Sequence, residues 1–98
     1  MSENRISLSG IVVEREALRH TPAGIPILSF RIEHASTQVE NSVPRQVQVE
    51  MDAMAVGELA QRMDQLRNGQ KVGVQGFLAK RSRQSSRVIL HINQFEIE

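Results

Sequence analysis

Residues 46–78 read QVQVEMDAMAVGELAQRMDQLRNGQKVGVQGFL, and this stretch decides the fold because its hydrophobic period changes twice. Apolar and polar residues alternate over 46–52, which is typical of a strand with one buried face. Over 55–66 the apolar residues fall at helical spacing, and Asn68-Gly69 provides a stop for a short amphipathic helix. Alternation returns over 72–78. The stretch therefore predicts a strand, one short helix and another strand.

Three further strands are predicted outside this stretch. Residues 6–13 form the first, and Gly10 inside it is expected to mark a bend or bulge where a barrel turns its corner. Residues 25–34 form the second strand, after a cluster of turn-forming residues. Residues 88–97 form the last strand. Its apolar residues change phase near Asn93-Gln94, so a bulge is expected there.

The order of these elements indicates an all-β barrel. Five strands with one short helix between the third and the fourth make up the five-stranded Greek-key barrel of the OB fold. Residues 35–44 are mostly polar and are interpreted as a long loop between the second and third strands. A chain of 98 residues is long enough for one hydrophobic core, so we expect a single domain over residues 1–98. Such a barrel presents its second and third strands to oligonucleotides or oligosaccharides.

Composition and charge exclude several classes of protein. The sequence has no cysteine, which excludes a disulfide framework and thiolate chemistry. It has no apolar run near the roughly 20 residues that cross a bilayer. Its first residues lack the charged and then apolar pattern of a signal peptide. We therefore expect a cytoplasmic protein without a membrane contact. The formal net charge of +1 does not by itself indicate nucleic acid, because the distribution of charge matters more.

One segment of the chain is locally cationic. The predicted loop between the fourth and fifth strands, residues 80–87, has four basic residues and no acidic one. Such a run often only keeps a hairpin soluble, but on an OB barrel this loop frames the ligand face, where cations follow the phosphates of a single strand. Arginines in the first loop and on or beside the candidate face add to it. The candidate phosphate contacts are Lys80, Arg81, Arg83, Arg87, Arg19, Arg31 and Arg45.

Aromatic residues for base stacking are scarce. There is no Trp or Tyr, and there are three Phe. Phe30 and Phe95 are in phase with apolar neighbours and are expected in the core, whereas Phe77 is out of phase and precedes the basic loop. Phe77 is therefore the stacking candidate. Since stacking contributes about 1–3 kcal/mol per base, its scarcity predicts binding that depends on phosphates and weakens steeply with salt.

No set of residues indicates catalysis. His20, His34 and His91 lack the spacing of metal ligands, and no glycine pattern for nucleotide phosphates is present. Glu50 and Asp52 share a strand face and could hold a metal, but such pairs are common on solvated strands. We therefore expect no enzymatic activity, metal, cofactor or small-molecule substrate.

Several short motifs are spaced along nearly the whole chain. They are Asn4-Arg5-Ile6, Leu8-Ser9-Gly10, Pro22-Ala-Gly-Ile-Pro26 with Phe30 and Glu33-His34, Val74-Gln-Gly-Phe77, Val88-Ile-Leu-His91 and Gln94. In this order and spacing they resemble the bacterial primosomal replication protein N family, known as PriB. No single motif is decisive, since strand-glycine and Gly-Phe pieces also occur in single-stranded DNA-binding proteins.

The resemblance implies a homodimer of OB folds that binds single-stranded DNA. It also implies that the dimer helps the PriA helicase, with other primosome proteins, to restart stalled replication forks. DNA contacts would come from the basic loop, and Arg19 and Arg45 align with family positions that are basic. Gln48 and Val43 stand where the better-studied family pattern has a tryptophan and a phenylalanine that contact DNA, and Gln48 is therefore a further candidate DNA contact. Ala35 stands where that pattern has an arginine. The resemblance therefore implies DNA binding with less stacking.

Two alternatives remain open. The missing aromatic residues motivate the first, a protein-interaction adapter for the restart helicase whose nucleic-acid face has largely decayed. Tight binding to the helicase with little dependence on DNA would favour it. The second is an RNA-binding OB module. Competition between single-stranded DNA and RNA of the same sequence would test it, because only RNA offers the 2′-hydroxyl.

Overall fold

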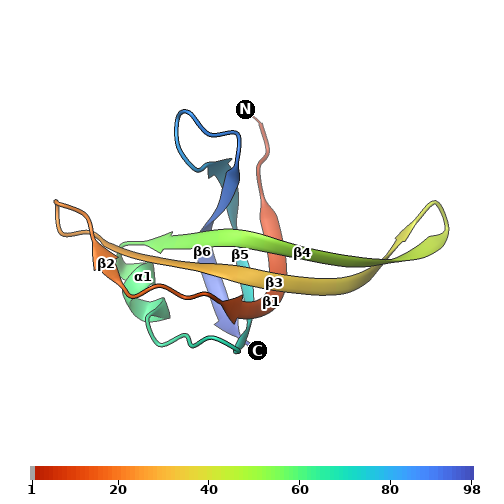
Figure 1. The fold of residues 1–98 in the computed structure, drawn as a ribbon, viewed down its shortest axis with the longest axis horizontal. Helices are drawn as coiled ribbons and strands as arrows, with labels where there is room; N and C mark the ends of the chain where they lie inside the picture. Colours follow the sequence, from red (N-terminus) through yellow and green to blue (C-terminus); the bar gives the residue numbers. More distant parts are fainter. Residues whose placement is uncertain (1) are drawn as a thin grey trace.

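The computed structural model describes residues 2–98. Six strands and one helix follow one another along the chain (Figure 1). They are β1 (Ile6–Val13), β2 (Arg19–His20), β3 (Pro26–Glu40), β4 (Val43–Val56), α1 (Glu58–Met63), β5 (Lys71–Lys80) and β6 (Val88–Ile97). The first and last predicted strands have the observed bounds, and α1 lies between the two strands expected to flank it.

Five of the strands close a barrel. The sheet runs in the order β1-β5-β6-β4-β3, and β1 also pairs with β3, which joins the two ends. All these pairings are antiparallel except that of β4 with β6. The two-residue strand β2 only extends the sheet beside the start of β3. The predicted five-stranded OB barrel with one short helix is therefore confirmed.

Gly10 lies where β1 changes partner. Residues up to Ile11 pair with β5, and Ile11 to Val13 pair with β3. A Cβ at Gly10 would overlap the carbonyl oxygen of Glu33 and the side chain of Ile32. Glycine is required here because the two backbones approach too closely for any side chain, as expected of a glycine at a barrel corner.

The bulge expected near Asn93-Gln94 is present. Gln75 pairs with Gln94, but the next residue, Gly76, pairs with Ile92, so Asn93 is the extra residue on β6. A Cβ at Gly76 would overlap the carbonyl oxygen of His91. The bulge thus explains why the apolar residues of β6 change phase.

The prediction of a loop over residues 35–44 is wrong. This segment is the end of a long β3–β4 hairpin, in which Glu40 pairs with Val43 and only two residues form the turn. Those two residues, Asn41 and Ser42, have φ values of 52° and 62°, which are typical of a type I′ turn. The hairpin projects past the barrel, with solvent on both faces, so its sequence shows no alternation (Figure 1). The third predicted strand, 46–52, is accordingly too short.

The predicted helix over 55–66 is too long. Ala55 and Val56 still belong to β4, where they pair with Leu28 and Ile27, and the helix itself ends at Met63. Helical spacing continues through the sequence because Ala55 and Leu66 are both buried, although neither is in the helix. The buried residues on either side of the helix therefore extend the helical spacing of apolar residues beyond the helix itself.

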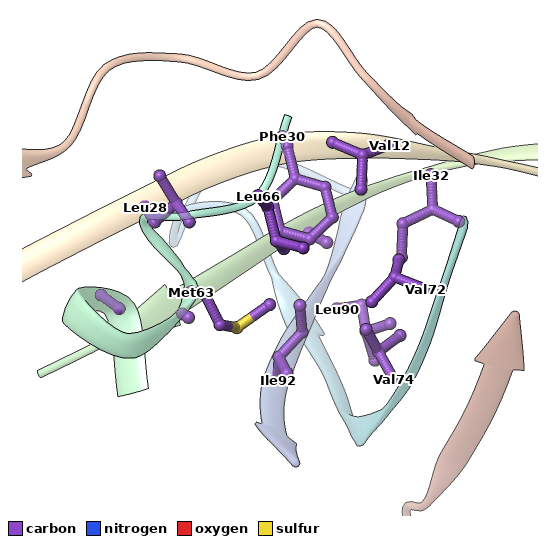
Figure 2. Packing of buried hydrophobic residues seen from close by; sticks show 13 residues of the cluster. Val12, Leu28, Phe30, Ile32, Met63, Leu66, Val72, Val74, Leu90 and Ile92 are labelled. Carbon is purple, nitrogen blue, oxygen red and sulfur yellow. The ribbon is translucent and has the colours of Figure 1, made fainter. Parts of the chain in front are cut away.

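The core fills the barrel and extends under α1. Phe30 is buried, as predicted, and Met63 and Leu66 lie among the strand side chains (Figure 2). Phe95 is only partly buried but packs against the same cluster. The six-residue α1 is the one helix among residues 2–98, and it is too short to cross a bilayer. The cluster consists of Val12, Leu28, Phe30, Ile32, Ala53, Ala55, Ala60, Met63, Leu66, Val72, Val74, Leu90 and Ile92.

Candidate nucleic-acid interface

The basic loop between β5 and β6 stands clear of the barrel (Figure 1). Its base is closed by a backbone hydrogen bond of 2.9 Å from the Arg81 amide to the Arg87 carbonyl. A second one, of 3.2 Å, runs from the Ser85 amide to the Ser82 carbonyl. All the predicted cations of this loop are exposed. The loop therefore presents its charge to solvent, and its base sets Arg81 beside Arg87.

A carboxylate of β4 joins this loop to the barrel. Arg81 Nη1 donates a hydrogen bond of 2.7 Å to Asp52 Oδ2, and Arg87 Nη2 lies 3.7 Å from the same oxygen. Arg31 Nε of β3 donates to Asp52 Oδ1 at 3.1 Å. The Asp52 side chain is only 18% exposed. Three of the predicted phosphate contacts therefore converge on Asp52, which the sequence suggested only as half of a metal pair.

Arg31 is surrounded by further carboxylates. Its Nη1 lies 2.9 Å from Glu14 Oε2 and 3.8 Å from Glu50 Oε2. The hydrogen bond to Asp52 and then the attraction of Glu14 raise the pKa of Arg31 above its ordinary value. The guanidinium is thus engaged within the protein. Glu50 and Asp52 have no third possible metal ligand beside them, since no group of three or more such ligands occurs within residues 2–98.

The outer face of β3 and β4 is rich in acidic residues. Here the outer face means the side chains that share a face with the Arg31–Asp52 pair. Glu33 lies directly opposite Glu50 in the register, a like-charge pairing that is unfavourable in an antiparallel sheet. This face, which OB proteins offer to oligonucleotides, therefore carries a local excess of negative charge beside its arginines.

The structure separates the other predicted contacts from this cluster. Arg19 is exposed on β2, at the start of the β3 strand. Gln48 is exposed on the outer face of the hairpin, opposite Ala35. Arg45 pairs with Gln38 on the inner face, and its Nε lies 2.5 Å from Glu40 Oε1. The predicted site is therefore spread over three places: the basic loop with Arg31, the β2 strand and the hairpin.

Phe77 has a ring partner that the sequence did not reveal. It is 42% exposed and stacks on His91, with ring centroids 5.1 Å apart and planes inclined by 5°. The two residues are cross-strand partners on β5 and β6. Only the register brings them together, because the bulge at Asn93 shifts the pairing. Phe77 and His91 form a flat, partly exposed platform close to the basic loop.

A groove of about 870 Å³ lies between β1 and the hairpin. The first half of β1 pairs with β5 on one side, and no strand of residues 2–98 pairs with its other side. His34 reaches across the groove, and its Nδ1 donates to the Ser9 carbonyl at 2.7 Å, while its Nε2 is 2.8 Å from Ser36 Oγ. Val49, which is 41% exposed, also lines the groove.

Comparison with known proteins gives a consistent result. A family model described as "another single-strand binding protein family" matches residues 4–94. Replication restart protein PriB of Nitrosomonas europaea is 32% identical over 99% of this chain and 90% of that protein. Replication restart protein PriB of Bordetella pertussis is 42% identical over 93% of this chain and 85% of that protein.

Solved structures agree. The protein PriB from Ralstonia solanacearum superimposes with a TM-score of 0.86 at 32% identity, covering 98% of each chain. The single-stranded DNA binding protein from Thermus aquaticus superimposes with a TM-score of 0.81 at 21% identity, covering 98% of this chain and 50% of that one. The second likeness is one of fold.

Proposed function

This chain belongs to the PriB family of replication restart proteins, and from that premise we propose that it binds single-stranded DNA as a homodimer and supports the PriA helicase. The observation that carries the proposal is the exposed basic loop beside the ligand face of an OB barrel. The role is one of binding without catalysis, cofactor or metal. We place it in the cytoplasm, where bacterial chromosomes are replicated.

Phosphates are the main target of the proposed site. Lys80, Arg83 and Arg19 form no ion pair with any carboxylate of residues 2–98, so their charges are available to DNA. Arg81 and Arg87 are exposed but share Asp52. Cations of this kind attract a single strand without reading its sequence.

The Phe77–His91 platform offers one stacking position. Phe77 belongs to β5, whose last residue, Lys80, leads directly into the basic loop. We expect a base to stack on the exposed part of Phe77. With a single platform, phosphates supply most of the affinity, since each stacked base contributes only about 1–3 kcal/mol.

The homodimer has a physical basis in the groove under the hairpin. The unpaired edge of β1 is self-complementary across a two-fold axis, because two antiparallel copies of one edge can hydrogen-bond to each other. The exposed Val49 and the groove around Ser9 would be covered by the second copy. The dimer would then carry two basic loops, and binding of a strand to one loop would raise its effective concentration at the other.

The acidic outer face favours a second candidate function. Glu33, Glu50 and Asp52 reduce the attraction of this face for phosphate. This negative charge favours an adapter that binds the helicase and has low affinity for nucleic acid. Retention of PriA by the purified chain after nuclease treatment, together with no binding of single-stranded DNA at low salt, would support the adapter.

Replacing both Arg81 and Arg83 by alanine tests the DNA site. Both side chains are exposed, so we expect an unchanged fold and single-stranded DNA binding that is at least several-fold weaker. Fluorescence anisotropy of a labelled oligo-dT of about 30 nucleotides measures it. Arg67→Ala, an exposed position after α1, is the control for loss of a positive charge outside the loop and should bind as the parent does. Equal affinity of the double variant and the control would remove the loop from the site.

The same assay distinguishes DNA from RNA. Unlabelled oligo-dU and oligo-rU of equal length, which differ only in the 2′-hydroxyl, compete for the labelled strand. We expect DNA to compete at least as well as RNA, and stronger competition by RNA would instead support the RNA-binding module, which would then be using the 2′-hydroxyl.

A further inference from the structure

Both oxygens of Asp52 are occupied by arginines. Oδ1 accepts from Arg31 Nε at 3.1 Å, and Oδ2 accepts from Arg81 Nη1 at 2.7 Å, with Arg87 Nη2 at 3.7 Å. The carboxylate is 18% exposed, whereas the side chains of Arg81 and Arg87 are 48% and 69% exposed. Asp52 is thus mostly covered, and the loop arginines lie above it.

The loop geometry lets one carboxylate hold both arginines. The hydrogen bond from the Arg81 amide to the Arg87 carbonyl sets the two residues opposite each other at the base of the loop. Their side chains turn back toward β4. Lys80, the last residue of β5, and Arg83 within the loop form no ion pair with Asp52.

Arg31 offsets only part of the negative charge around Asp52. It is shared with Glu14 and Glu50, and Glu50 also faces Glu33 across the sheet. A phosphate that approaches Arg81 or Arg87 therefore meets a carboxylate within a few ångströms, in a region with more acidic neighbours. An arginine has five N–H donors and can contact both groups, but the repulsion between phosphate and carboxylate remains.

We propose that Asp52 is a positioning residue that holds Arg81 and Arg87 back from phosphate and so sets the affinity for single-stranded DNA below what the loop would otherwise provide. This rests on the proposed DNA-binding function and adds an internal competitor to it. Phosphate and Asp52 compete for the same two guanidinium groups. In the free chain Asp52 holds the two arginine side chains at the base of the loop, and a bound strand must displace or tolerate the carboxylate.

Asp52→Asn tests the proposal, because it removes the charge and keeps the shape. We expect oligo-dT of about 30 nucleotides to bind about three- to tenfold more tightly, the effect of freeing two partly exposed ion pairs. Glu96→Gln on β6 changes the net charge equally and forms no ion pair within residues 2–98. It should change affinity less than about twofold, since screening weakens the effect of a distant exposed charge.

A second readout does not need DNA. Hydrogen exchange of the amides of residues 81–87 in the free protein should be faster in Asp52→Asn than in the parent, because the loop loses its anchor. Amides of the barrel core should be unchanged. Equal loop exchange in both proteins would show that Asp52 does not hold the loop and would overturn the proposal.

A pair of loop variants covers the case in which Asp52→Asn does not fold. Arg81→Gln should weaken binding less than Arg83→Gln does, because only Arg81 is already neutralised by a carboxylate. Where Asp52→Asn does fold, the loss caused by Arg81→Gln should become larger in its background, which is the coupling that a double-mutant cycle measures. An equal or greater loss from Arg81→Gln in the parent would contradict the proposal.

The outcomes separate the inference from the function it rests on. If the parent and Asp52→Asn both fail to bind DNA at low salt, the proposed function is wrong. If the parent binds and Asp52→Asn binds equally or more weakly, Asp52 orients the arginines toward DNA or has no role, and the inference alone is overturned.

Discussion

At Gly10 the chain has no room for even one methyl group. The β1 backbone crosses there from β5 to β3, against the carbonyl of Glu33. At the functional face a single residue, Asp52, likewise has a large effect, because its carboxylate contacts three arginines. Gly10 could be singled out from the sequence, because a glycine inside an alternating strand is itself a signal. The role of Asp52 could not, because its partners come from distant parts of the chain.

Gly10→Ala should destabilise the barrel. Its Cβ would overlap backbone that cannot move without opening the β1–β3 pairing, and overpacking of this kind costs about 1–3 kcal/mol. We expect the melting temperature to fall by at least about 4 °C in circular dichroism or calorimetry. Gly73→Ala is the control, because the one close contact of its Cβ would be with the movable carboxylate of Glu98. Equal melting temperatures for the two variants would argue against a close crossing at Gly10.

At the scale of elements, the β3–β4 hairpin shows why part of the fold could not be predicted from the sequence. Alternation identified the strands wherever one face lies on the core. The same strands continue past the barrel, where both faces meet solvent, so residues 35–44 show no alternation and their sequence predicts a loop. The bulge on β6 was visible because it shifts buried residues from one face to the other.

The hairpin also bears on the proposed homodimer. Val49→Glu places a charge in the groove between β1 and the hairpin, and we expect it to convert a dimer into a monomer in sedimentation or light-scattering measurements. Val56→Glu is the matched control, because Val56 is on the same strand and is 46% exposed, compared with 41% for Val49, but does not line the groove. We expect Val56→Glu to remain dimeric.

Two results would count against this dimer. A monomeric parent protein would exclude the homodimer itself. A dimeric Val49→Glu would keep the homodimer but move its interface to another surface. Circular dichroism of both variants should match that of the parent, since both valines are already partly in water.

On the scale of the whole molecule, opposite charges share one face. The chain has a formal net charge of +1, yet it gathers cations on the β5–β6 loop and carboxylates on the adjacent outer face. The location of the loop and the exposure of Phe77 were predictable, since both follow from element order and strand phase. The pairing of Phe77 with His91 and of the loop with Asp52 was not, because each depends on register and loop conformation.

The most direct test of the account is the salt dependence of single-stranded DNA binding. Anisotropy of labelled oligo-dT of about 30 nucleotides is measured from about 20 to 300 mM salt. Two to four phosphate contacts per basic loop predict a linear fall of log affinity with log salt, with a slope of roughly −1.4 to −2.8 for each loop engaged. Binding that does not change with salt, or no binding at the lowest salt, would contradict phosphate-led binding by this loop.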